Sequence, residues 1–226
     1  MASEMERSSN RFAEIAEVIV GEEGVKFVIY ANIFRARSMF FRSRLSKEWN
    51  TNKTPTILED IAPGHFDDYI ACTHSLQSMS GHGESDYFTQ LFDIYVLADR
   101  FGDSAAMNTI ADEAVKHSDS VKKVPAWKAL KPYLAQLPVT SPLYRIMVDM
   151  YMQEASRGGL QKVLDDEKDE ATQTFLVAVA ETYLREKPDK NAPAAKPLHK
   201  IFYGTVSGNP KCHYHQHDQL CLKCQE

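Results

Sequence analysis

Residues 17–45 read EVIVGEEGVKFVIYANIFRARSMFFRSRL, and the spacing of the apolar residues changes within this stretch. Two short runs come first, at residues 18–20 and 25–30, and both are rich in β-branched and aromatic residues. The Gly-Glu-Glu-Gly sequence between them is a polar turn with a glycine at each end. Together these features predict a hairpin of two antiparallel strands.

The end of the same stretch has the spacing of an amphipathic helix. From residue 33 onward, side chains that can share one helical face recur every three or four residues. These residues are Ile33, Phe34, Arg37, Phe40, Phe41 and Leu45. One helix over residues 33–45 is therefore expected directly after the hairpin.

This order of elements resembles the beginning of a BTB/POZ domain. In that family a pair of strands runs into a helix that carries a small residue, an Arg-Ser pair and aromatic residues. The matching residues here are Ala36, Arg37, Ser38, Phe40 and Phe41. The later phrase YVLADRFG, at residues 95–102, is also similar to the final-helix phrase of the family.

The resemblance covers residues 12–118 and implies an α+β fold in which helices cap a small three-stranded sheet. Residues 1–11 are expected to be a disordered leader. The other elements expected in this domain are a strand at residues 56–58 and helices at residues 63–73, 87–101 and 105–115.

Residues 119–186 are predicted to form an all-α extension behind this domain. Ser141 and Pro142 suit the N-cap and the first position of a helix. The pair Gly158-Gly159 is expected to end that helix. A last apolar stripe is expected to face the core and consists of Phe175, Leu176, Val179, Tyr183 and Leu184.

Composition indicates a folded intracellular protein. The chain has 226 residues, 43% of them hydrophobic, which is enough for a substantial core. The net charge of −5 argues against direct nucleic-acid binding, and no apolar run approaches the roughly 20 residues of a membrane helix. With no secretory signal and three of the four cysteines crowded near the end, no disulfide framework is expected. We expect a cytoplasmic or nuclear location and no membrane partner.

The sequence contains no catalytic constellation. It has no glycine-rich phosphate loop and no nucleophile elbow. Cys72 and His74 lie two residues apart on a predicted helix, where side chains do not face each other, so a buried cysteine beside a surface histidine is expected. The acidic run at residues 165–170 lacks a glycine-centred calcium loop and is expected to be solvated. The chain is therefore not expected to be an enzyme.

The resemblance implies a protein-interaction module, either a dimerising adaptor for a cullin-type ubiquitin ligase or a transcriptional regulator. The hydrophobic-x-Glu triplet of cullin-binding members would fall on residues 49–51, Trp-Asn-Thr, without its acid. A protein partner is thus expected, either a second copy of the chain or another protein, and a cullin is the less expected identity. The candidate partner-binding residues are the exposed cations Arg35 and Arg42, whose alternative is a solvated helix face, and the loop residue Trp49.

The alternative function is that of a zinc-binding regulatory protein whose working site is the C-terminal end. Residues 187–211 are predicted to be a linker, and residues 212–226 form a Cys/His-rich tail that is either flexible or bound to zinc. The two-residue gap between Cys221 and Cys224 lets both thiolates reach one tetrahedral ion. The candidate ligands are Cys212, His215, Cys221 and Cys224, with His217 as a substitute for His215.

If this structural zinc is present, elemental analysis of the purified chain should find about one zinc ion per molecule. The double variant Cys221→Ser, Cys224→Ser should lose the metal, because a tetrahedral site does not survive the removal of two of its four ligands. The core should stay folded, since the linker separates the tail from it. Metal-free wild-type protein would mean that the tail is only a polar end.

Overall fold

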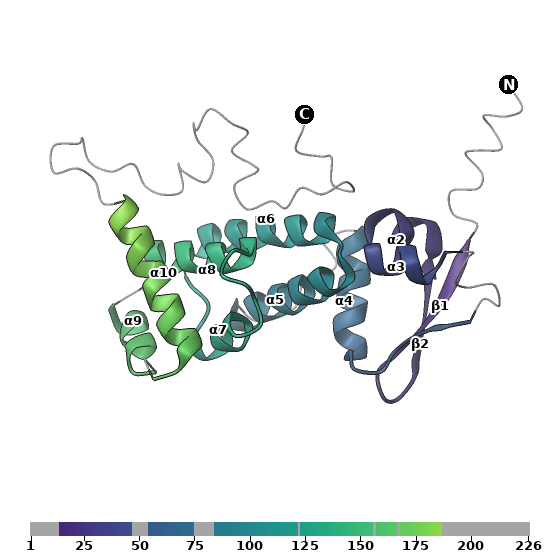
Figure 1. Ribbon diagram of the computed structural model, residues 1–226, viewed down its shortest axis with the longest axis horizontal. Helices are drawn as coiled ribbons and strands as arrows, with labels where there is room; N and C mark the ends of the chain where they lie inside the picture. The colour runs from purple at the N-terminus through teal and green to yellow at the C-terminus, as the bar shows by residue number, and fades with distance from the viewer. Residues whose placement is uncertain are drawn as a thin grey trace, which may run out of the picture. The chain divides into compact units, whose positions relative to one another are not determined.

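The computed structural model describes residues 14–46, 54–74, 84–121, 123–155, 157–166 and 168–186 (Figure 1). Within these ranges the chain forms one three-stranded sheet and nine helices, which confirms the α+β class. The predicted leader, linker and tail, at residues 1–11, 187–211 and 212–226, lie outside the described residues.

The described residues divide into two compact units. The first contains residues 14–74 and 96–107, and the second contains residues 84–95 and 108–186. The helices α5 (Glu84–Phe101) and α6 (Ser104–Val121) therefore each contribute to both units. The predicted limit between residues 118 and 119 falls inside α6, and the assignment of residues 12–118 to a BTB/POZ-like domain stays a prediction.

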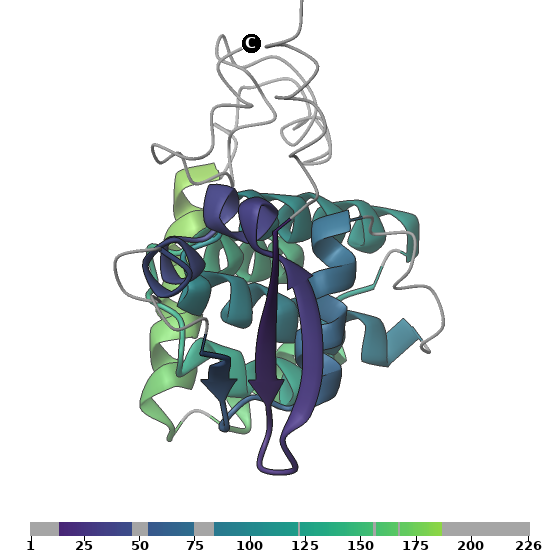
Figure 2. The same ribbon diagram turned by 90° about the vertical axis from the view of Figure 1, so that its right-hand side faces the viewer.

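The sheet of the first unit contains the predicted hairpin and the predicted third strand (Figure 2). Its strands are β1 (Ile15–Val20), β2 (Val25–Tyr30) and β3 (Thr56–Leu58), in the order β2-β1-β3. β2 runs antiparallel to β1, and β3 runs parallel to it. Both glycines of the turn adopt positive φ angles, 78° at Gly21 and 67° at Gly24. Such angles strain most other residues, which explains why glycine occupies these two positions.

Two helices stand where one was expected. α2 (Ala31–Arg37) ends before Ser38, and α3 (Met39–Arg44) begins after it. Ser38 has an extended backbone, with φ −110° and ψ 128°. Its Oγ accepts the N–H of Phe41 at 3.2 Å and donates to the carbonyl oxygen of Phe101 at 2.6 Å. The prediction of a single helix is wrong because this serine caps a new helix instead of continuing the old one.

A buried carboxylate joins three helices of the first unit. Asp103 is fully buried. Its Oδ2 accepts hydrogen bonds from the Tyr69 hydroxyl at 3.0 Å and from Arg37 Nε at 3.2 Å. Its Oδ1 accepts the N–H of Ala106 at 2.9 Å, which caps the start of α6. Asp103 therefore connects α2, α4 (Pro63–His74) and α6.

Aromatic rings fill the space around this carboxylate. The ring centroids of Phe41 and Phe101 are 5.1 Å apart, and those of Tyr69 and Phe101 are also 5.1 Å apart. Phe66 of α4 meets Phe27 of β2 edge to face at 5.1 Å, so the inner face of the sheet rests on the same cluster. α5 ends at Phe101, and the next residue, Gly102, has a φ of 61°. Asp103 follows Gly102 and directly precedes α6.

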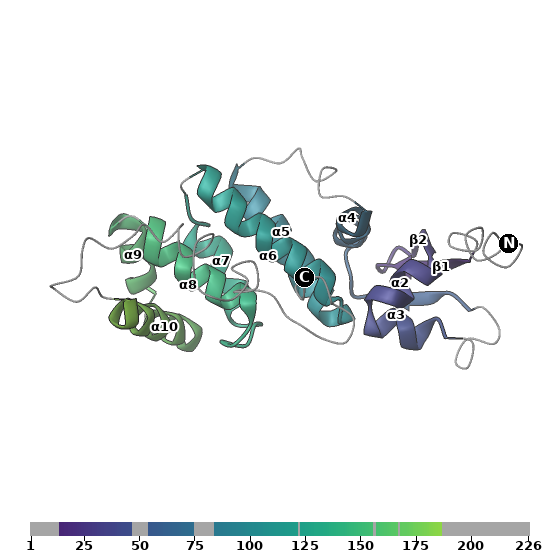
Figure 3. The same ribbon diagram turned by 90° about the horizontal axis from the view of Figure 1, so that it is seen from above.

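The second unit contains the helical extension. Its four last helices, grouped together in Figure 3, are α7 (Trp127–Leu134), α8 (Pro142–Glu154), α9 (Arg157–Leu164) and α10 (Glu170–Glu186). The predicted cap is confirmed, since Ser141 Oγ accepts the N–H of Tyr144 at 3.1 Å. Phe175 of α10 is fully buried, and its ring lies 5.5 Å from that of Trp127.

Two predictions for this unit are wrong. The helix α8 ends before Ala155, and Gly158 and Gly159 lie inside α9 rather than ending a helix. The last stripe is buried at Phe175, but Tyr183 is 55% and Leu184 is 68% exposed. Regular spacing shows that a helix has an apolar face, yet it does not show how far a neighbouring helix extends along that face.

The variant Asp103→Ala should lower the free energy of unfolding by about 3 to 5 kcal/mol, because it leaves a buried hydroxyl and a part-buried guanidinium without their acceptor. Urea denaturation followed by circular dichroism measures this loss. Asp60→Ala is the matched control. The Asp60 carboxylate likewise pairs with an arginine, Arg100 at 2.6 Å, but its side chain is 64% exposed. The control should unfold close to the wild-type midpoint. Equal losses in both variants would contradict the structural role of Asp103.

Candidate protein-interaction surface

The outer face of the sheet in the first unit is largely apolar. Side chains alternate along a strand, so one face of β1, β2 and β3 packs on the helices and the other faces outward. We call this outer face the sheet surface; it consists of Ile15, Glu17, Ile19, Lys26, Val28, Tyr30 and Ile57. In Figure 2 no described helix lies in front of these strands.

Four apolar or aromatic residues of the sheet surface are highly exposed. Ile15 is 63%, Val28 58%, Ile57 55% and Tyr30 41% exposed. An antiparallel sheet with one face in water usually carries polar residues on that face. Exposed apolar side chains gathered on one face, as they are here on both sides of the Glu17–Lys26 pair, mark sites where proteins meet other molecules. The sheet surface is therefore the strongest candidate for a binding site among the described residues.

The two charged side chains of the sheet surface neutralise each other. Lys26 Nζ lies 2.9 Å from Glu17 Oε1, and both side chains are about half exposed. The surface thus offers apolar contact area with one internal ion pair and no net charge. Such a surface fits an apolar segment of another protein better than a phosphate backbone or any other strongly charged partner.

The cationic residues that the sequence indicated lie elsewhere. Arg35 belongs to α2, and its side chain is 24% exposed, bound to the carboxylate of Glu14 and, at 3.2 Å, to the carbonyl oxygen of Leu45. The expected exposure of Arg35 is therefore wrong, because its charge already has an acidic neighbour. Arg42 of α3 is exposed, and its Nε donates to the carbonyl oxygen of Arg35 at 3.2 Å. Trp49 lies outside the described residues.

Sequence reasoning missed the sheet surface, although a signal was present. Residues 18–20 are all apolar, and residues 25–30 contain only one charged residue. Runs of this kind indicate that both faces of a strand are apolar. The sequence alone does not show that helices cover one of these faces and leave the other open.

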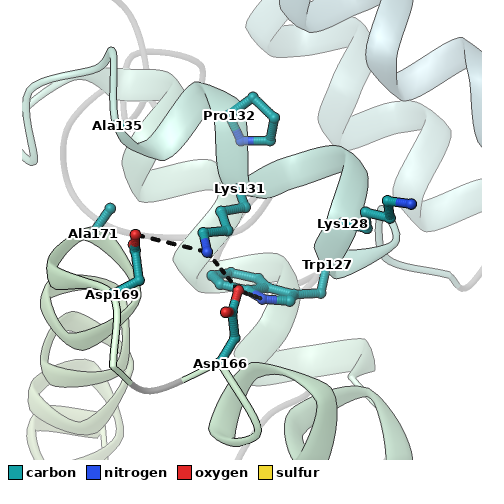
Figure 4. Close-up of a pocket in the computed structure, with 8 residues that line it drawn as sticks. All are labelled: Trp127, Lys128, Lys131, Pro132, Ala135, Asp166, Asp169 and Ala171. Carbon is teal, nitrogen blue, oxygen red and sulfur yellow. Dashed lines mark hydrogen bonds and ion pairs between the residues drawn. The ribbon is translucent and has the colours of Figure 1, made fainter.

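A hollow of about 400 Å³ in the second unit brings charged side chains together (Figure 4). Trp127 Nε1 and Lys131 Nζ both donate to Asp166 Oδ2, at 3.1 and 2.7 Å. Asp169 lies 3.7 Å from the same amine and also accepts the N–H of Thr172 at 3.1 Å. These contacts tie α7 to the connection between α9 and α10.

The charges in this hollow stabilise one another. The hydrogen bonds from Lys131 and Trp127 lower the pKa of Asp166, and the bond to Asp166 raises the pKa of Lys131. Each group therefore keeps its charge over a wider pH range than in an unfolded chain. Asp166 and Asp169 belong to the acidic run that was expected to be solvated; their side chains are 42% and 41% exposed, and both also pair with Lys131. The arrangement therefore has a structural role, because its polar groups already form hydrogen bonds and ion pairs with one another.

The remaining candidate groups are a cysteine and the proposed metal ligands. Cys72 is buried, as predicted, and burial raises the pKa of its thiol to about 12. Within the described ranges no three His, Cys, Asp or Glu side chains are placed to hold a metal ion. The zinc ligands proposed at Cys212, His215, Cys221 and Cys224, with His217 as the substitute, lie outside those ranges.

Comparison with known proteins adds no relative, because no protein-family model, no curated protein and no solved structure matches the chain. The similarity to BTB/POZ domains thus rests on the sequence at residues 36–41 and 95–102 and stays a prediction. None of the described helices combines the length and the apolar character needed to cross a bilayer.

Cys72 should be inert in the folded protein. In the variant Cys212→Ser, Cys221→Ser, Cys224→Ser it is the single thiol, and at pH 8 its raised pKa keeps it protonated and unreactive. Labelling with a maleimide should be at least about 100-fold slower in buffer than in concentrated urea, where the pKa returns to about 8.5. Adding Val177→Cys, at a position 56% exposed, provides a rapidly labelled control. Comparable rates for Cys72 in buffer and in urea would contradict its burial.

Proposed function

We propose that this chain is a protein-interaction module with a BTB/POZ-like domain, and that its sheet surface binds a protein partner. The observation that carries the proposal is the outward exposure of Ile15, Val28 and Ile57 on one continuous face. Each of these side chains is more than half exposed. A partner that covers them removes apolar area from water, which is favourable by about 25 cal/mol per Å² of area buried.

The packing beneath the sheet holds the sheet surface in place, which suits it to bind a partner. Its inner face rests on the aromatic cluster through Phe27 and Phe66, and Asp103 fixes the helices beneath. A rigid surface loses little conformational entropy on binding, because its backbone is already ordered. Strands therefore present these side chains more precisely than a loop would.

A catalytic role has less support from the described residues. Two tyrosines whose pKa values are raised, Tyr69 and Tyr133, lie inside packed cores. Burial and then the neighbouring Asp103 raise the pKa of Tyr69, while burial and the hydrogen bond to Asp93, at 2.7 Å, raise that of Tyr133. Both hydroxyls serve as structural donors to carboxylates. A non-enzymatic function remains part of the proposal.

The resemblance offers two biological forms for the module. One is an adaptor that links a bound protein to a cullin-type ubiquitin ligase, and the other is a transcriptional regulator. Residues 49–51, where the cullin-binding triplet would fall, lie outside the described residues, and the sequence there lacks the acid. A partner other than a cullin is therefore our first choice. A binding assay with the purified N-terminal region of a cullin decides this point, and micromolar association would reverse the choice.

The main test compares two matched variants of the full chain in its native cells. Ile57→Glu places a charge on the sheet surface, whereas Val177→Glu changes an equally exposed apolar residue of α10, at 56% against 55% exposure. Quantitative mass spectrometry after affinity purification should show a partner that Ile57→Glu loses at least about tenfold, a loss of roughly 1.4 kcal/mol in binding. Val177→Glu should retain the same partner.

The partner identified in this way should then bind the purified wild-type chain and discriminate between the same two variants. Melting temperatures of both variants must match that of the wild type, which establishes that the fold is intact. Equal retention of every partner by Ile57→Glu would show that the sheet surface is not the binding site.

A further inference from the structure

Among the described strands, none pairs with the outer edge of β2, which is an end strand in the order β2-β1-β3. The N–H of Ala31 donates to the carbonyl oxygen of Glu14 at 2.9 Å, so these two residues form a hydrogen-bonded pair of the antiparallel ladder. Hydrogen-bonded and non-hydrogen-bonded pairs alternate along such a ladder. The main-chain groups of Lys26 and Val28 consequently face the open edge.

This edge carries little of the protection that sheet edges usually have. Natural proteins block edges with proline, with bulges or with charged side chains that would repel a second strand. β2 reads VKFVIY, without proline, and pairs in unbroken register with β1 from Val25 to Tyr30. Its single charge, on Lys26, already forms an ion pair with Glu17 at 2.9 Å. The edge is therefore suited to pairing with another strand.

We propose that two copies of this chain associate through antiparallel pairing of their β2 strands, with a two-fold axis at Val28 that makes one continuous six-stranded sheet. The inference rests on the proposed function only in treating the sheet as the interaction surface. A two-fold axis perpendicular to the sheet keeps the two sheet surfaces on the same side, so their apolar residues join.

The side chains of β2 are complementary to themselves in this register. Val28 lies opposite Val28 of the second copy, which pairs two side chains that are each 58% exposed. Lys26 lies opposite Tyr30 of the second copy, where the aliphatic part of the lysine can pack on the aromatic ring while the ammonium group keeps its ion pair with Glu17. The two Lys26 residues are four positions apart along the pair, roughly 13 Å, so their charges repel weakly.

The neighbouring register, with its two-fold axis at Phe27, is less favourable. An axis at Phe27 would place Lys26 opposite Val28 and bring the two Lys26 residues within roughly 7 Å of each other. It would also shorten the overlap of the outward-facing main-chain groups. The axis at Val28 therefore gives a longer pairing and a greater separation of like charges than the axis at Phe27.

This arrangement leaves part of the sheet surface available. Ile57 lies on β3, which is separated from β2 by β1. Pairing at β2 covers the Val28 side of the surface and leaves the Ile57 side to a different partner. One module could thus dimerise and hold a bound protein at the same time.

Cysteine cross-linking tests the register in the full chain with Cys212, Cys221 and Cys224 replaced by serine. Directly opposite Cα atoms in a hydrogen-bonded pair are about 5.5 Å apart, within the span of a disulfide. Val28→Cys should therefore give a disulfide-linked dimer under mild oxidation. Lys26→Cys, also exposed and on the same strand, should not, because its two copies lie too far apart. Linkage of Lys26→Cys at the same yield, or of neither variant, would overturn the proposed register.

Sedimentation velocity tests the association itself. The wild type should be a dimer at micromolar concentration, and Val28→Glu should weaken the dimer at least about tenfold by placing two carboxylates opposite each other. Ile57→Glu is the matched control and should stay dimeric. A wild-type monomer, or a Val28→Glu variant as dimeric as the wild type, would overturn the inference.

The two proposals fail separately. A monomer that still captures a partner through Ile57 would overturn the dimer and leave the proposed function intact. A dimer that Val28→Glu breaks, combined with no partner that depends on Ile57, would keep the dimer and overturn the binding of another protein.

Discussion

The first unit depends on the buried carboxylate of Asp103. A charged group without access to water is tolerated only when hydrogen bonds and an opposite charge compensate for its lost hydration. Arg37, Tyr69 and the N–H of Ala106 supply this compensation from three different helices. The carboxylate therefore favours the arrangement of these helices that brings all three donors to it, and the aromatic cluster closes around it.

The consequence for function is a sheet with two different faces. Phe27 and its neighbours fix the inner face on the aromatic cluster, while Val28 and Ile57 point outward from the same strands. An apolar outer face lowers the solubility of a chain unless another protein covers it. The open edge of β2 adds main-chain hydrogen-bonding groups beside that face. Apolar area and an unpaired strand edge are the two features that proteins use to recognise one another through sheets.

Local patterns in the sequence predicted the elements well. The hairpin, the short third strand and the end of α5 at Gly102 follow from turn residues and alternation, which act within a few positions. The break at Ser38 is stabilised by a hydrogen bond to the carbonyl oxygen of Phe101, 63 positions away, in addition to the local cap, and the charge of Arg35 is paired with Glu14. Contacts between distant segments decide such features, so periodicity could not reveal them.

The candidate site could not be predicted from the sequence for a similar reason. Val28 is apolar in the sequence whether it lies in a core or on a surface. Only the packing of the described helices on one face of the sheet distinguishes it from its neighbour Ile29, which is 2% exposed. The cations chosen from the sequence stood out because charge is visible locally. Both of these cations, Arg35 and Arg42, belong to helices, and the third candidate, Trp49, lies outside the described residues.

Amide hydrogen exchange by NMR, recorded at several protein concentrations, tests most directly whether the sheet edge is an interaction site. The amides of Phe27 and Ile29 face β1 and should be protected at every concentration. The outward amides of Lys26 and Val28 should become protected only as the concentration rises and the strands of two copies pair. Unprotected exchange of Lys26 and Val28 at all concentrations, with Phe27 and Ile29 protected throughout, would contradict this account.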